Sequence, residues 1–180
     1  MKSQTAHPSA GSLEVFERQH VHPTPGRTLI VGSRVYPGRA DRRRLHEDAV
    51  GVDMLAGDGV DRVLNLEDDL PEDLGQFDHV ECLSVLEHSR RPWLLAANLE
   101  RLMAPGASLF VAVPFVWRVH AYPDDYWRMT PSAIRALFPR IEWRALKLAG
   151  RSVTDKPEST KIAGHPYFAR TETVGFGVLA

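Results

Sequence analysis

Two short apolar runs end in residues whose types and spacing suit nucleotide binding. Residues 28–32 end in Gly32, and residues 49–53 end in Asp53, which follows Gly32 by 21 positions. A glycine turn lets a ligand approach the backbone, and exposed amides there bind carboxylates or nucleotides. A carboxylate about 20 residues later typically accepts hydrogen bonds from ribose hydroxyls. The alternative is structural, with Gly32 as a plain turn residue and Asp53 capping the turn at 54–59.

Two further polar segments follow apolar runs. Residues 65–71 carry groups that reach an adenine edge in one interpretation and form a solvated acidic loop in the other. Residues 84–88 follow the apolar run at 77–84. If these runs are the strands of a parallel sheet, the strand order is expected to reverse at this position and a cleft to open. In the structural interpretation this segment is a helix cap with Glu87 in solvent, whereas His88 is a lining residue, a surface residue or a base.

The loop at 114–130 is rich in aromatic and titratable residues, and loops beyond strand ends often carry function. His120 is the first candidate for a general base, because the unperturbed pKa of histidine lies near neutrality. Asp125 would orient the imidazole or bind the substrate from which the base removes a proton. Tyr126 and Arg128 would hold hydroxyls or an anionic group of that substrate. These four residues are the predicted catalytic set.

The same loop has a packing interpretation. Trp117, Tyr126 and Trp127 would cover the open edge of the sheet, since burying such rings is their commonest use. An ion pair between Asp125 and Arg128 would then pin the loop. No metal site is expected, because no third ligand accompanies the neighbouring carboxylates of Asp124 and Asp125.

The elements that position these residues alternate between strands and helices. Short apolar runs bounded by Gly, Asp or Pro are typical of buried parallel strands, and they occur at 28–32, 49–53, 62–64, 77–84 and 108–114. A helix is expected from Pro92 to the Pro105-Gly106 stop, and another from Pro131 to Pro139. Further strands are expected at 141–148 and 173–179. The alternation predicts a doubly wound, Rossmann-like α/β sheet with its ligands beyond the carboxyl ends of the strands.

Composition limits the protein class. The 180 residues suit one domain, which we place at 28–180, preceded by an arm or lid at 1–27 that is rich in Pro, His, Ser and Gly. With 22 basic and 23 acidic residues, the net charge of −1 predicts neither nucleic-acid nor membrane binding. The single cysteine, Cys82, and the absence of a long apolar run lead us to expect a cytoplasmic protein.

Several stretches together resemble the class I S-adenosylmethionine-dependent methyltransferases, in particular the methyltransferase type 11 group. The most specific stretch is Val-Leu-Glu-His at 85–88, followed by a helix and by Ala-Pro-Gly at 104–106. The resemblance covers about residues 28–148 and implies an antiparallel final strand at 173–179. It also implies S-adenosylmethionine as the cofactor.

Carried over by position, the resemblance assigns the cofactor contacts. Gly32 and Ser33 would flank the methionine part, Asp53 would bind the ribose, and Met54 would pack against adenine. Asn65 and Leu66, which follow the next expected strand, would border the adenine. Ser84 would lie beneath the sulfonium.

The chain departs from the family in two places. The usual glycine-rich turn is replaced by residues 32–38, which hold glycine only at the two ends, and the following helix is abbreviated to about residues 41–45. Three readings therefore stay open. The first is a methyltransferase acting on a small-molecule acceptor, with a sugar or glycan hydroxyl as one candidate.

The second reading is a catalytically inactive cofactor-binding or partner protein with the same fold. The third is a nicotinamide-dependent oxidoreductase, which would normally carry the Gly-x-Gly-x-x-Gly turn that this chain lacks. The sequence does not specify the acceptor, the atom type that is methylated (oxygen, nitrogen or carbon) or the oligomeric state.

Overall fold

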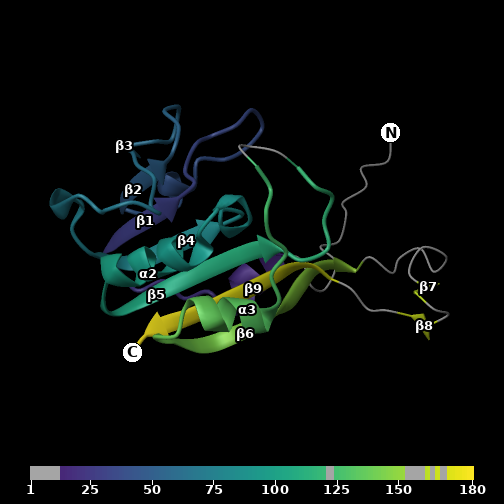
Figure 1. The fold of residues 1–180 in the computed structure, drawn as a ribbon. Coiled ribbons are helices and arrows are strands. Elements are labelled where there is room, and N and C mark those ends of the chain that lie inside the picture. Colours follow the sequence, from purple (N-terminus) through teal and green to yellow (C-terminus); the bar gives the residue numbers. More distant parts are fainter. Residues whose placement is uncertain (1–12, 121–123, 153–160, 163–164, 167–169) are drawn as a thin grey trace, which may run out of the picture.

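The computed structural model describes residues 13–120, 124–152, 161–162, 165–166 and 170–180. Its seven-stranded sheet has the order β3-β2-β1-β4-β5-β9-β6 (Figure 1). Strands β1 to β5 are parallel, whereas β9 runs antiparallel to both β5 and β6. The predicted doubly wound sheet with an antiparallel last strand is therefore confirmed.

The elements follow the apolar runs of the sequence. The strands of the large sheet are β1 (Arg27–Val31), β2 (Asp48–Asp53), β3 (Arg62–Val63), β4 (Phe77–Leu83), β5 (Met103–Pro114), β6 (Ile141–Ser152) and β9 (Arg170–Leu179). The helices are α1 (Leu13–His20), α2 (Pro92–Leu102) and α3 (Pro131–Leu137), with 3₁₀ turns η1 (Arg42–Leu45), η2 (Glu72–Leu74) and η3 (Leu86–His88). A separate ribbon pairs β7 (Lys161–Ile162) with β8 (His165–Pro166).

Helices α2 and α3 cover one face of the sheet (Figure 1). Leu95 and Leu99 of α2 and Ile134 of α3 are buried in one cluster with alternate side chains of the central strands. Pro92 occupies the first turn of α2, where its missing amide hydrogen has no partner to lose. Helix α3 begins where the Thr130 hydroxyl accepts a hydrogen bond from the backbone amide of Ala133, at 3.2 Å.

Helix α1 packs on the opposite face. Its Phe16 is buried and stacks on Phe110 of β5, with ring centroids 6.3 Å apart. Val174 and Phe176 of β9 complete this second apolar cluster. Residues 13–20 of the predicted arm thus form a helix held by the core, and residues 1–12 of that arm lie outside the described residues.

The abbreviated helix after β1 is confirmed as the single 3₁₀ turn η1. Its Arg42 reaches the buried Glu81 of β4 through two guanidinium nitrogens, and it also pairs with Glu17 of α1 at 2.7 Å. His46 adds a contact from its Nε2 to Glu81 Oε1 at 3.1 Å. A polar network therefore links η1 and the residue after it to β4 and α1.

Candidate functional site

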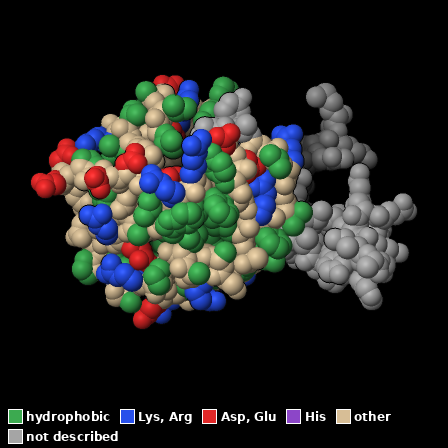
Figure 2. Space-filling view, viewed as in Figure 1, with side chains coloured by type: hydrophobic (Ala, Val, Ile, Leu, Met, Phe, Trp, Pro, Cys, Tyr) green, Lys and Arg blue, Asp and Glu red, His purple; other side chains and the backbone are tan. Residues whose placement is uncertain are grey.

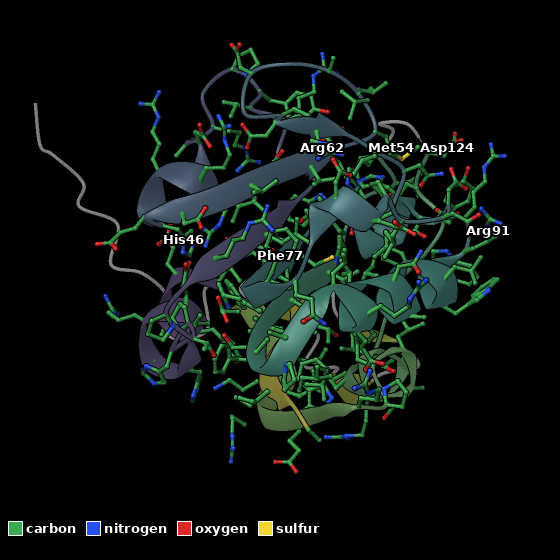
Figure 3. The ribbon with its side chains drawn as sticks, turned by 90° about the vertical axis from the view of Figure 1, so that its left-hand side faces the viewer. His46, Met54, Arg62, Phe77, Arg91 and Asp124 are labelled. Carbon is green, nitrogen blue, oxygen red and sulfur yellow. The ribbon has the colours of Figure 1, made fainter. Side chains whose placement is uncertain are left out.

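Three strand ends meet at one edge of the sheet. Val31 pairs with Val52 of β2 and with Cys82 of β4, so the residues that follow these strands emerge together. Figure 3 shows Met54 and Asp124 toward one end of the sheet and His46 toward the other. The carboxyl edge predicted to bind ligands is therefore assembled from segments far apart in the sequence.

The turn after β1 requires glycine. Gly32 has a φ of 68°, and a Cβ placed there would lie only 2.6 Å from Cγ2 of Val85, in the turn after β4. A side chain would meet both backbone strain and this contact. The close approach shows that the Gly32 turn and the segment after Ser84 touch each other.

The backbone amides of this turn have partners within the protein. Gly32 and Ser33 donate to the Val52 carbonyl at 2.9 and 3.1 Å, and Val35 donates to the Asp58 carbonyl at 2.8 Å. The free amides expected for anion binding are thus already used. The Ser33 hydroxyl, by contrast, is buried and has no hydrogen-bond partner.

The Asp53 carboxylate lies at the end of β2 and is half-buried. It accepts hydrogen bonds from the amides of Arg34 at 3.2 Å and Leu55 at 2.9 Å. The second contact is the turn cap of the structural interpretation. A carboxylate offers about four acceptor positions, so about two remain for ligand hydroxyls.

The predicted adenine contacts separate into exposed and buried residues. Met54 is exposed at the edge, and its side chain is free to pack against a ligand. Leu66 is buried in the main core, and the Asn98 amide donates to its carbonyl at 2.9 Å. Asn65 holds its own loop, because its Oδ1 accepts from the amide of Glu67 at 3.1 Å. Met54 therefore presents the larger accessible apolar surface of these residues.

Ser84 is the one non-glycine residue with positive φ in the described part of the chain, at 55°. Its amide donates to the Ala112 carbonyl of β5 at 2.8 Å, and the residue is exposed. A non-glycine residue in this region costs about 1 kcal/mol or more. The strain lies where β4 ends, at the position assigned to the sulfonium.

Asp125 organises the predicted catalytic loop. It accepts hydrogen bonds from the His120 amide at 2.8 Å and from Arg128 Nη2 at 2.7 Å, and its Oδ2 lies 3.0 Å from His120 Nδ1. The Arg128 guanidinium holds the pKa of Asp125 well below its usual range. The His120 Nδ1 thus lies between the Asp125 carboxylate and the Arg118 carbonyl, at 3.3 Å from the latter, and the charge of Arg128 is compensated by Asp125.

Tyr126 lies at the rim of the same loop. Its hydroxyl donates to the Asp124 carboxylate and accepts from Arg90 Nε, both at 2.8 Å. The amides of Tyr126 and Trp127 donate to the Glu87 carbonyl at 2.7 and 3.3 Å. These contacts dock the loop onto η3, so the packing interpretation describes part of its role.

The side chains of Trp117, Tyr126 and Trp127 are all partly exposed. Trp127 packs edge to face on Trp93 of α2, with ring centroids 6.4 Å apart, and its Nε1 donates to the Ser89 carbonyl at 2.7 Å. Figure 2 shows apolar side chains gathered near the centre of the face of the molecule that is viewed in Figure 1. Exposed apolar surface beside the carboxyl edge is suited to an organic acceptor.

Glu87 contradicts the structural interpretation of residues 84–88, which placed it in solvent. Instead of lying in solvent, its side chain is fully buried, and neither carboxylate oxygen has a hydrogen-bond partner. Burial raises the pKa of Glu87 to about 7. The 3₁₀ turn that sends Leu86 into the core also carries Glu87 inward, beneath the loop docked on it.

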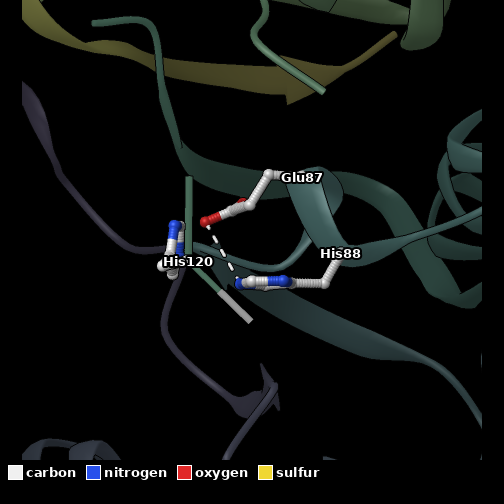
Figure 4. A group of neighbouring side chains, drawn as sticks. All are labelled: Glu87, His88 and His120. Carbon is white, nitrogen blue, oxygen red and sulfur yellow. Dashed lines mark ion pairs between the residues drawn. The ribbon is translucent and has the colours of Figure 1, made fainter. Parts of the chain in front are cut away.

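Glu87 belongs to a cluster with two histidines (Figure 4). His88 Nε2 lies 3.7 Å from Glu87 Oε1, and the His88 and His120 rings meet edge to face with centroids 4.9 Å apart. One ligand atom from each of the three residues lies within 4.8 Å of the others. Glu-His adjacency after one strand and a histidine after the next were the sequence signal for this cluster.

Comparisons with known proteins identify the fold. No family model and no curated protein sequence matches the chain. A methyltransferase from Archaeoglobus fulgidus, described as SAM dependent, aligns over 86% of this chain and 86% of its own, with a TM-score of 0.61 and 14% identity. The 1,6-didemethyltoxoflavin-N1-methyltransferase of Burkholderia thailandensis aligns over 87% of this chain and 72% of its own, with a TM-score of 0.61 and 14% identity.

The chain has the class I methyltransferase fold. A third such structure, an S-adenosylmethionine-dependent methyltransferase from Mesorhizobium loti, covers 89% of this chain and 94% of its own, with a TM-score of 0.58 and 14% identity. The sheet order of this fold is the one observed here. Among the helices of the described residues, none combines the length and apolar character needed to cross a membrane.

Proposed function

We propose that this chain is an S-adenosylmethionine-dependent methyltransferase acting on a small-molecule acceptor. The observation that carries the proposal is the convergence of Gly32, Asp53 and Ser84 at the carboxyl ends of β1, β2 and β4. In a sheet of this order, ligands bind at that edge. The Burkholderia neighbour was solved with S-adenosylhomocysteine, the demethylated form of the same cofactor.

The residues at this edge fit the cofactor. Asp53 keeps acceptor positions for ribose hydroxyls, Met54 offers an exposed apolar side chain, and Ser84 lies exposed in a strained turn. When bound, the cofactor supplies a methyl group activated by a sulfonium. The protein then needs chiefly to align the acceptor and exclude water.

His120 is the group proposed to take the proton of the acceptor hydroxyl. Its Nδ1 faces the Arg118 carbonyl and the Asp125 carboxylate, both acceptors, which leaves Nε2 with a lone pair that can accept a proton. Arg128 fixes Asp125 and acts as a positioning residue. Tyr126 and the neighbouring indoles line the rim, where a sugar hydroxyl is one acceptor to be tested.

The experiment follows methyl transfer from isotope-labelled S-adenosylmethionine to a panel of hydroxyl, amine and carbohydrate acceptors. We expect label in at least one product, and a loss of about 10²-fold or more in kcat for His120→Ala. An exposed control, His22→Ala, should retain full activity. Cofactor binding without transfer to any acceptor would favour the inactive binding protein.

A further inference from the structure

Two segments bring three metal-binding side chains to one point. Glu87 and His88 come from η3, and His120 comes from the loop after β5, 32 residues beyond His88 in the sequence. Their candidate ligand atoms lie within 4.8 Å of one another (Figure 4). Ligands around a zinc ion lie about 2.0 to 2.2 Å from it, so small side-chain movements would close the cluster on a cation.

Hydrogen bonds fix the two imidazoles in the tautomer that binds metals. His88 Nδ1 lies 2.6 Å from the carbonyl oxygen of Asp124, which only accepts, so Nδ1 carries the hydrogen. His120 Nδ1 likewise faces only acceptors, with the Arg118 carbonyl oxygen at 3.3 Å and the Asp125 carboxylate at 3.0 Å. Each Nε2 is therefore left with a free lone pair. Metal-binding histidines typically donate their second ring nitrogen to a carbonyl or carboxylate.

The Glu87 carboxylate is an independent indication of a missing partner. Its side chain is completely buried, and both oxygens are without a hydrogen bond, although one lies 3.7 Å from His88 Nε2. Leaving a buried carboxylate without compensation is costly. The nearby Arg128 directs its hydrogen bonds to Asp125 and to backbone carbonyls, so it donates none to Glu87. A bound cation would satisfy the carboxylate.

We propose that Glu87, His88 and His120 form a binding site for a divalent transition-metal ion of the Zn²⁺, Mn²⁺ or Fe²⁺ class. Two imidazoles and one carboxylate favour these ions over Mg²⁺ or Ca²⁺, which prefer all-oxygen ligands. Three protein ligands leave coordination positions open. An acceptor oxygen is suited to occupy one of them.

The role of the ion rests on the proposed function. A hydroxyl bound to the cation becomes more acidic, so its proton passes to solvent while the oxygen attacks the methyl carbon and the carbon–sulfur bond breaks. With the ion bound, His120 Nε2 is a ligand and no longer the base. Metal occupancy thus replaces one means of activating the acceptor by another.

The test is calorimetric titration of the tag-free, EDTA-treated full chain with Zn²⁺, supported by the visible absorption of bound Co²⁺. We expect one ion per chain, at least tenfold weaker binding in Glu87→Gln and His88→Ala, and weaker binding of Mg²⁺ than of Zn²⁺. The matched control is His22→Ala, which removes an exposed histidine from another segment and should bind as the wild type does. Thermal melting checks that each variant is folded.

The outcomes separate the two proposals. Absence of Zn²⁺ binding by the wild type, or wild-type affinity in both cluster variants, would overturn the metal site. Binding of Mg²⁺ as tight as that of Zn²⁺ would overturn the assigned class of ion. Because S-adenosylmethionine binding is titrated separately, its failure beside intact Zn²⁺ binding would refute the cofactor site alone.

Discussion

Glu81 and Glu87 are two buried glutamates only six residues apart, yet their surroundings are opposite. Glu81 lies within β4, where Arg42 and His46 contact both of its oxygens. Glu87 follows the end of the same strand, and its oxygens have no hydrogen-bond partner. The Glu81 carboxylate is therefore part of a hydrogen-bonded network, whereas the Glu87 carboxylate can still accept hydrogen bonds or bind a cation.

The difference appears in their pKa values. Burial alone would raise the pKa of Glu81, but interactions with His79 and Arg42 outweigh it and lower the pKa to about 2. For Glu87, burial dominates and raises the pKa to about 7. A charge that is paired, as that of Glu81 is, stabilises the folded state. A buried carboxylate without a hydrogen-bond partner at a ligand-binding edge, such as Glu87, is typical of functional sites.

Removal of the cation that compensates Glu81 should have the largest effect. Arg42→Met removes the permanently charged partner of a buried carboxylate and leaves it only neighbouring histidines, so we expect the free energy of unfolding to fall by about 3 to 5 kcal/mol. Urea denaturation at neutral pH measures it. Arg44→Met, at an exposed position of the same turn, should change stability by less than about 0.5 kcal/mol. Equal effects of the two substitutions would contradict the structural role of Glu81.

The two glutamates should also give stability opposite pH dependences. The depressed pKa of Glu81 contributes stability above about pH 4.5, the ordinary value, and this is lost as the pH falls toward 2. A shift of this size corresponds to about 3 kcal/mol. Glu81→Gln should flatten this acid limb in pH-dependent urea denaturation. An unchanged limb would refute the assignment.

Glu87 should act in the other direction. Its raised pKa contributes stability below pH 4.5, which is lost as the pH rises through about 7. In metal-free buffer with EDTA, Glu87→Gln should therefore be more stable than the wild type by about 2 to 3 kcal/mol at pH 8, with little difference at pH 4. Destabilisation at pH 8 would mean that Glu87 has a compensating partner after all.

The smallest expected effect concerns the strained turn between the two glutamates. Ser84→Gly should stabilise the protein by about 0.5 to 1 kcal/mol, because glycine adopts the positive φ without strain. Gly32→Ala is the opposite case and should destabilise it, because its Cβ would meet Val85. Thermal melting of both variants measures these changes. A destabilised Ser84→Gly would show that the hydroxyl contributes more than the strain removes.

The sequence predicted the fold well because local patterns determine it. Apolar runs bounded by turn residues gave the strands, and Pro92 and Pro131 marked the starts of two helices. The meeting of strand ends at one edge follows from parallel connectivity. Placement of the Gly32 and Asp53 region was therefore accessible without coordinates.

Local patterns could not predict the state of Glu87. Its burial depends on the loop carrying Tyr126 and Trp127, whose amides bind the Glu87 carbonyl from about 40 residues away. The hydrogen bond from the Val35 amide to the Asp58 carbonyl likewise depends on the loop at 54–61 folding back onto the Gly32 turn. Tertiary contacts of this kind have no signature in residue spacing.

Calorimetric titration with S-adenosylmethionine tests whether this edge of the sheet binds the cofactor, on the wild type, Asp53→Ala and the control Asp48→Ala, an exposed residue at the other end of β2. We predict one cofactor per wild-type chain and about 10- to 100-fold weaker binding for Asp53→Ala, since hydrogen bonds to a charged group contribute about 1.5 to 3 kcal/mol each. Asp48→Ala should bind as the wild type does. Folded wild-type protein that binds no S-adenosylmethionine would contradict the account.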